Sequence, residues 1–174
     1  CLLYFLLISV FASAQQPYGR LTEIQDTFRV GVQSGGSVQF KVNSIHTYKS
    51  GITYSAWTTL RIHCDKLEEG SNGVWELAVK AMAPDDSDSL QSNYPNRALA
   101  LDNLTLEAAN LAVIDGGTAT LMGKRTLTND YKTLIEEGDA GTYEVDINYT
   151  LGPVLGKPPA YYITNLDFYM RSTF

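Results

Sequence analysis

The sequence predicts an all-β domain, built as an antiparallel sandwich of about eight or nine strands. Several segments alternate apolar and polar residues with a period of two, which turns one face of each strand toward a core. Turns rich in glycine and proline separate these segments, and no stretch keeps a helical apolar period beyond a turn or two. This pattern is typical of an immunoglobulin-like β-sandwich, with a closed barrel as the alternative.

The first 14 residues predict a signal peptide. The apolar run over residues 2–11 is too short to span a bilayer, and the small residues Ala12-Ser13-Ala14 follow it as a cleavage site. We therefore expect residues 1–14 to be removed and residues 15–174 to form the single domain of an exported protein, which is secreted or held at the cell surface. An N-terminal core strand is the alternative for this run.

The first part of the domain predicts three strands. Residues 27–33 (TFRVGVQ) and 37–45 (SVQFKVNSI) both alternate, and the glycine pair between them favours a hairpin. The apolar parity changes within residues 52–64, so we expect a β-bulge near residues 55–58. Residues 15–32 are the part that we expect to act between molecules by strand addition, with an ordinary first strand as the alternative.

The middle of the chain predicts shorter strands between turns. Its alternating segments are residues 74–83, 99–107, 111–114 and 118–122. The last two flank Asp115-Gly116-Gly117 and predict a second hairpin. Residues 84–96 are polar and predict a loop, and a single helical turn fits residues 108–111.

The clearest strand covers residues 141–151 (GTYEVDINYTL), and we expect the rest of the chain to pack around it. The face predicted to be buried carries Tyr143, Val145, Ile147, Tyr149 and Leu151. Residues 161–170 predict a final strand. We expect both Trp57 and Trp75 in the core, with a ligand platform as the alternative for Trp57 beside the bulge.

The charge and composition restrict the partners. The net charge of −6 argues against nucleic acid and anionic membranes, since both attract basic surfaces. Eleven tyrosines among only 18% charged residues suit the amphipathic strand faces of an extracellular β-protein. We expect a chain that does not span a membrane.

No group of residues predicts a catalytic centre, a cofactor site or a metal site. His63 and Cys64 are adjacent on a strand and point to opposite faces, and His46 lies far from both in the sequence. Cys64 continues the buried parity, so we expect an inert thiol with no disulfide or metal. The acidic run Asp85-Asp86-Ser87-Asp88-Ser89 carries oxygen ligands of the kind that bind Ca²⁺. It lacks the glycine and the glutamate of a calcium loop, which favours the alternative of a loop exposed to solvent.

The strand at residues 141–151 also carries a resemblance to a known family. Gly141-Thr142-Tyr143 and the alternation after it resemble the Gly-x-Tyr strand late in bacterial pilin-type subunits and spore-coat-U-like domains, and residues 126–134 with the acidic turn after them are similar too. The resemblance covers the last third of the chain. It implies an exported bacterial surface subunit with an immunoglobulin-like sandwich that assembles by strand exchange into fibres or coats. The chain differs from that family in its single mature cysteine and in the further strand at residues 161–170.

These observations predict a non-catalytic exported surface protein, the structural or adhesive subunit of a fibre or coat. Its partners would be copies of itself or other surface subunits. The alternative is a secreted carbohydrate-binding module whose exposed aromatic residues form a sugar platform, with the candidates Tyr48, Tyr54, Tyr94 and Tyr161. Neither function needs a cofactor, and we do not expect an enzyme, since no pair of carboxylates is placed for acid and base work.

Overall fold

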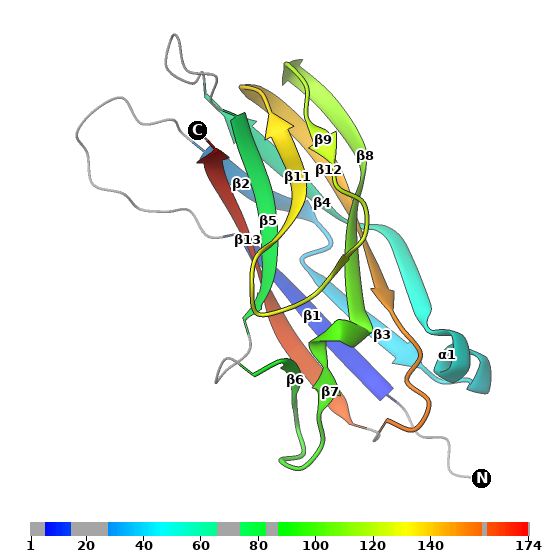
Figure 1. Cartoon of the computed structure of the whole chain (residues 1–174). Helices are drawn as coiled ribbons and strands as arrows, with labels where there is room; N and C mark the ends of the chain where they lie inside the picture. Colours follow the sequence, from blue (N-terminus) through cyan, green and yellow to red (C-terminus); the bar gives the residue numbers. More distant parts are fainter. Residues whose placement is uncertain (1–5, 15–27, 66–73, 83–86, 158–159, 174) are drawn as a thin grey trace.

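The chain folds into two β-sheets that face each other, as Figure 1 shows. The structure is a computed structural model that describes residues 6–14, 28–65, 74–82, 87–157 and 160–173. These residues contain 13 strands, more than the sequence predicts. The predicted all-β sandwich is confirmed, whereas the immunoglobulin-like order of connections stays a prediction.

The larger sheet, sheet A, contains eight strands. They are β1 (Leu6–Ala14), β3 (Ser37–Val42), β5 (Val74–Met82), β6 (Ser89–Ser92), β7 (Leu99–Ala100), β9 (Thr120–Leu121), β11 (Lys132–Gly138) and β13 (Tyr161–Thr173). The main path runs in the order β3-β1-β13-β5-β11-β9, while β6 pairs with β13 and β7 pairs with β6. The pairing of β1 with β13 is parallel and the other pairings are antiparallel.

The smaller sheet, sheet B, contains five strands, all antiparallel. They are β2 (Phe28–Ser34), β4 (Ile52–Cys64), β8 (Leu104–Gly116), β10 (Arg125–Thr126) and β12 (Gly141–Leu151), in the order β10-β8-β12-β4-β2. The short helix α1 (Ile45–Ser50) carries the chain from β3 to β4, and the 3₁₀ turn η2 (Leu101–Asn103) precedes β8. Ser44 caps α1 by accepting a hydrogen bond from the Thr47 amide at 3.1 Å.

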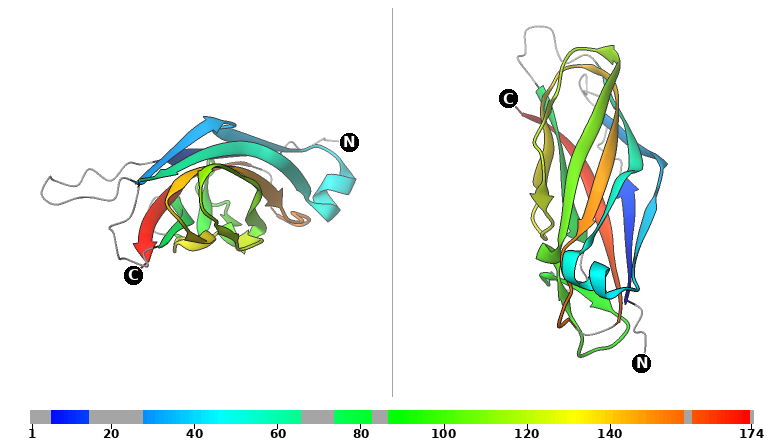
Figure 2. Two further views of the ribbon diagram at one scale, coloured as in Figure 1. Left: turned by 90° about the horizontal axis from the view of Figure 1, so that it is seen from above. Right: turned by 90° about the vertical axis from the view of Figure 1, so that its right-hand side faces the viewer.

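One hydrophobic core lies between the two sheets. Figure 2 shows the arrangement of the sheets from two further directions. Strand β12 lies at the centre of sheet B, and the five residues on its predicted inner face are at most 1% exposed. The predicted central strand is therefore confirmed. Trp75 on β5 and Cys64 on β4 are also buried as predicted, and Cys64 forms no disulfide.

Both predicted hairpins are wrong, because at each one the chain crosses from one sheet to the other. Strand β2 pairs with β4 in sheet B, whereas β3 pairs with β1 in sheet A. At this corner Gly35 has a φ of +67°, and a Cβ there would overlap the Trp57 carbonyl. Likewise, β8 belongs to sheet B and β9 pairs with β11 in sheet A. The glycine pairs thus mark tight crossovers and not two-residue hairpin turns.

The β-bulge predicted in β4 is confirmed. Two residues of β12, Ile147 and Tyr149, pair with Thr58 and Tyr54, so extra residues of β4 bulge between them, and Ala56 there has a φ of +49°. The bulge turns Trp57 outward, where 41% of the residue is exposed, so its predicted core position is wrong.

Two further local predictions are wrong. Residues 108–111 lie inside strand β8 and not in a helical turn, although Asn110 has a φ of +51° that interrupts the regular register with β12. The region predicted as a polar loop, residues 84–96, contains strand β6, in which Leu90 is buried. In both places short polar or small residues conceal strands that tertiary pairing stabilises.

A buried hydrogen-bond chain ties the bulge to the first crossover. The Tyr149 hydroxyl on β12 donates to Thr58 Oγ1 at 2.9 Å, and that hydroxyl donates to the Gly35 carbonyl at 2.6 Å. Thr58 and Tyr149 are both fully buried, and burial raises the pKa of Tyr149 to about 12. This chain of hydrogen bonds satisfies polar groups that are buried inside the core beside the crossover.

Candidate functional site

Strand β1 occupies a position in sheet A that suggests a site for strand addition. It lies between β3 and β13, antiparallel to the first and parallel to the second. The register places Ile8 and Val10 opposite Phe40 and Val38 of β3. Strand β1 is the one described strand that pairs with β3, so the attachment of β3 to sheet A depends on it.

We call this position the β1 slot. It is bounded by the backbone edges of β3 and β13 and by seven buried residues, Val38, Phe40, Val42, Tyr162, Thr164, Leu166 and Phe168. Burial raises the pKa of Tyr162, which agrees with an apolar slot wall, while Arg97 partly opposes this shift. A slot of this kind takes an extended segment through backbone hydrogen bonds and selects it by alternate side chains.

The strand that fills the slot comes from the residues predicted to be a signal peptide. Residues 6–14 form β1, and residues 1–5 lie outside the described part of the chain. The structure thus places residues 6–14 as a strand of sheet A, whereas burial in the core, which the alternative interpretation implies, is not described for them. Cleavage after Ala14 stays a prediction.

The segment predicted to act between molecules, residues 15–32, is only partly described. Residues 15–27 lie outside the described residues. The rest belongs to β2, which pairs with β4 of the same chain and buries Val30. Its ordinary role is therefore that of an edge strand of sheet B.

The four tyrosines predicted as a sugar platform do not form one surface patch. Tyr54 stacks on Phe40 with ring centroids 5.1 Å apart, and Trp57 leans on it at 5.0 Å, so Tyr54 is half-buried. Tyr48 is half-buried beside the core. Tyr94 and Tyr161 are each 49% exposed, and the Arg97 guanidinium lies over the Tyr94 ring at 4.4 Å.

The fold contains a different pair of aromatic residues, which the sequence did not predict. Tyr131 and Tyr169 lie on the outer face of sheet A with ring centroids 5.3 Å apart. Lys80 Nζ lies 4.7 Å from the centre of the Tyr131 ring, and the Tyr131 hydroxyl donates to Asp167 at 2.6 Å. Partial burial, followed by this carboxylate, raises the pKa of Tyr131 to about 12. The outward parity of Tyr169 was visible in the sequence, but the approach of Tyr131 from outside a regular strand was not.

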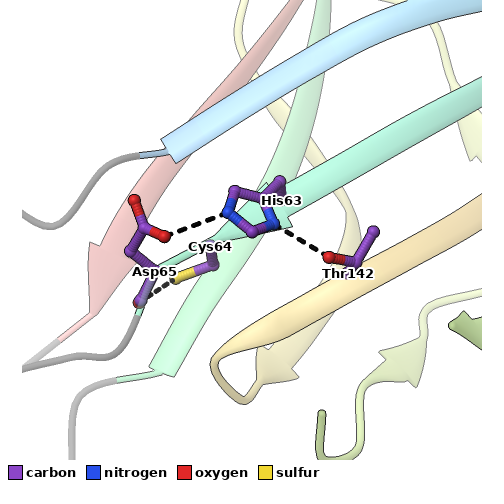
Figure 3. Close-up of polar contacts among 4 residues, drawn as sticks. All are labelled: His63, Cys64, Asp65 and Thr142. Carbon is purple, nitrogen blue, oxygen red and sulfur yellow. Dashed lines mark hydrogen bonds and ion pairs between the residues drawn. The ribbon is translucent and has the colours of Figure 1, made fainter. Parts of the chain in front are cut away.

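His46, His63 and Cys64, from which the sequence predicts no metal site or nucleophile, point to different parts of the fold. His46 is exposed on α1, whereas the His63 ring on β4 contacts Thr142 Oγ1 through Nδ1 at 2.8 Å and Asp65 through Nε2 at 3.0 Å (Figure 3). Cys64 lies on the opposite, buried face, as predicted. Among the described residues no group of three or more histidine, cysteine or acidic side chains is placed to hold a metal ion.

The acidic run is described only in part. Asp85 and Asp86 lie outside the described residues, so the proposed calcium loop has no structural test. Asp88 accepts a hydrogen bond from Asn129 Nδ2 at 3.1 Å, and its backbone carbonyl accepts from the Leu101 amide at 2.9 Å. These contacts tie the described end of the run to η2 and to the segment between β10 and β11.

Comparison with protein families and with curated proteins finds no relative. No protein-family model matches the chain, and no curated protein matches it at a significant level. Within the described ranges, no helix has both the length and the apolar character needed to cross a membrane. The arguments for function therefore rest on the sequence and on the surfaces described above.

Proposed function

We propose that this chain is a non-catalytic exported surface protein, a structural or adhesive subunit that assembles into a fibre or coat through strand and edge contacts. The observation that supports this proposal is the source of strand β1. The residues predicted to be cleaved during export are the same residues that fill the slot between β3 and β13.

Removal of β1 has a clear physical consequence. Strand β3 would lose its strand partner in the described sheet, and the edge of β13 would lose the hydrogen bonds of eight register pairs. Exposing buried apolar residues to water is costly, and so is leaving backbone groups unpaired where water does not reach them, so the slot would favour an added strand. A strand from a second subunit supplies both kinds of contact and links the subunits. The resemblance to pilin-type subunits points in the same direction.

Export of the full chain from a bacterial host tests this proposal. We expect mass spectrometry to find Gln15 as the first residue, and size-exclusion chromatography with electron microscopy to find ordered assemblies. Thr164→Lys places a long charged side chain in the slot and should prevent assembly, whereas Asn165→Lys, on the exposed face of the same strand, should not. A secreted protein that keeps residues 6–14, or a processed chain that stays monomeric at high concentration, would refute the proposal.

A secreted carbohydrate-binding module is the second candidate. The Tyr131–Tyr169 pair favours it, because two partly exposed rings beside Lys80 and Asp167 combine apolar faces with hydrogen-bonding groups, as sugars require. A glycan array tests this candidate with Tyr169→Ala as the variant and Tyr161→Ala as the control. Loss of binding in the first variant alone would support it, and no binding by the native protein would refute it.

A further inference from the structure

A hollow of about 540 Å³ lies on the outer face of sheet B, in the opposite layer from the β1 slot. Among the described residues, its lining comes from three neighbouring strands, β2, β4 and β12. The lining residues are Arg29, Gly31, Val32, Gln33, Arg61, His63 and Thr142. Its volume lies within the range of about 300–1,000 Å³ that is usual for small-molecule sites.

The floor of this hollow is Gly31, in the middle of strand β2. A Cβ at this position would meet no atom within 4 Å, so crowding does not require glycine here. Glycine weakens the interior of a strand, and in such a place it often marks the close approach of a ligand or another backbone. The missing side chain has one structural effect, which is the open space between Arg29 and Gln33 and beside Arg61, the register partner of Gly31.

Two arginines lie on opposite sides of this space. Arg29 pairs in register with His63, and Gly31 pairs with Arg61, so the two arginines are diagonal neighbours, for which a separation of about 7–8 Å is usual. The Arg61 side chain is 51% exposed and forms only a long 3.7 Å ion pair with Glu144. Within the described residues Arg29 forms no ion pair. Arg29 is therefore available to an anion, whereas Arg61 would have to exchange its long ion pair with Glu144 for the ligand.

The His63 ring forms a fixed wall of the hollow. Both of its nitrogens are occupied, one by the Thr142 hydroxyl and the other by Asp65, as the dashed lines in Figure 3 show. The ring is thus held in place by Thr142 on β12 and by Asp65, which directly follows β4. Gln33 and Thr142 add neutral polar groups at the rim.

The surrounding charges restrict the ligand further. Glu144 and Asp146 follow Thr142 on the same face of β12, the Asp65 carboxylate contacts the His63 ring, and the whole chain has a net charge of −6. These carboxylates repel a polyanion, whereas the two arginines favour one localised negative group. The planar guanidinium fork matches both carboxylate and phosphate groups, and the nearby acidic residues favour the anion with the lower charge, which is a carboxylate. A neutral, hydroxyl-rich body suits the remaining polar lining.

We propose that the Gly31 hollow binds a small carboxylate-bearing sugar of the uronic acid class, with its carboxylate held between Arg29 and Arg61. The site does not depend on assembly through the β1 slot, because it lies on the other sheet. Loss of one function would leave the other in place, so the two proposals fail separately.

Titration of the full-length protein with glucuronate, followed by amide NMR signals and calorimetry, tests this site. We expect saturable binding centred on the Gly31 and Thr142 amides, with affinity for glucose and for acetate lower by about tenfold or more, since each lacks one half of the recognised chemistry. Gly31→Val fills the hollow and should abolish binding, while its melting temperature stays the same or rises because valine favours strands. Arg61→Gln should weaken binding by about tenfold or more, and Lys41→Gln, exposed on β3, should bind as the native protein does.

Three results would overturn the proposal. The first is no saturable binding of glucuronate by the native protein. The second is equal affinity for glucuronate and either glucose or acetate, because the carboxylate or the sugar body would then contribute nothing. The third is native affinity in both Gly31→Val and Arg61→Gln. If Gly31→Val does not fold, Arg61→Gln decides alone, since that side chain is exposed and its loss should not affect folding.

Discussion

The buried chain from Tyr149 through Thr58 to the Gly35 carbonyl predicts a measurable coupling between two substitutions. Thr58→Val keeps the shape of the side chain but leaves the Tyr149 hydroxyl without an acceptor and the Gly35 carbonyl without a donor. Two buried groups without partners should together cost about 2–4 kcal/mol of unfolding free energy. Tyr149→Phe removes one donor and leaves the second hydrogen bond intact, so it should cost about 1 kcal/mol.

The double variant should be more stable than the sum of these costs implies. Once Thr58 is valine, the Tyr149 hydroxyl is a buried donor without a partner, and replacing it by phenylalanine removes that penalty. We expect the double variant to be about 1–2 kcal/mol more stable than additive behaviour predicts. Urea unfolding at neutral pH, with an unchanged dependence on denaturant, is the appropriate measurement.

An exposed pair on the same two strands provides the control. Thr53 Oγ1 and Thr150 Oγ1 lie 3.0 Å apart on the outer face, where water can replace either hydroxyl. Thr53→Val and Thr150→Val should each change stability by less than about 0.5 kcal/mol and should be additive. If Thr58→Val and Tyr149→Phe were additive as well, the buried chain would not connect these groups in the folded state.

Three further predictions concern the same core. The pKa of Tyr149 in the folded state, about 12, lies above its ordinary value of 10.0, so the folded state resists deprotonation of this hydroxyl. The resulting contribution to stability is complete below pH 10 and is lost as the pH rises to 12. It amounts to about 3 kcal/mol at most. Between pH 10 and pH 12 the unfolding free energy measured with urea should therefore fall more for the native protein than for Tyr149→Phe. Parallel pH curves for the two proteins would contradict this. Ile147→Asp should cost about 3–5 kcal/mol of unfolding free energy, because it buries a charge. Asp146→Asn should cost about 1 kcal/mol, because Asp146 accepts two hydrogen bonds on the outer face. Equal melting temperatures of the two variants would contradict the assignment of the two faces. Gly138→Ala should cost about 1–3 kcal/mol, since the new methyl group would overlap the Trp75 indole, and an unchanged melting temperature would show that the indole can move.

The sequence predicts the faces of the strands better than their partners. Alternation identified the buried face of β12 and the burial of Cys64, because a period of two decides which side chains meet a covered face. The same pattern does not say which sheet a strand joins. Gly35-Gly36 favours a hairpin and a crossover equally at the level of sequence, and the decisive contact, between Gly35 and Thr58 on the distant bulge, is visible only in the fold.

The candidate surfaces follow the same rule. Trp57 turns outward because a bulge reverses the face on which it lies. A change of parity in the sequence locates the bulge, but it does not show which way an individual side chain within the bulge will point. The Gly31 hollow requires Arg29 and Arg61 to lie on adjacent strands in one register, and that register comes from the pairing of β2 with β4. No spacing along the chain contains this information.

Residues 6–14 show how one sequence property serves two physical roles. An apolar run suits a signal peptide, and the same run suits a strand whose register places Leu6, Ile8 and Val10 opposite buried residues of β3. The two roles have different consequences for assembly. A chain cleaved after Ala14 needs another partner for β3, whereas a chain that retains residues 6–14 does not. The mass of the exported protein and its state of assembly must therefore change together: a chain that begins at Gln15 should be an oligomer, and one that keeps β1 should be a monomer.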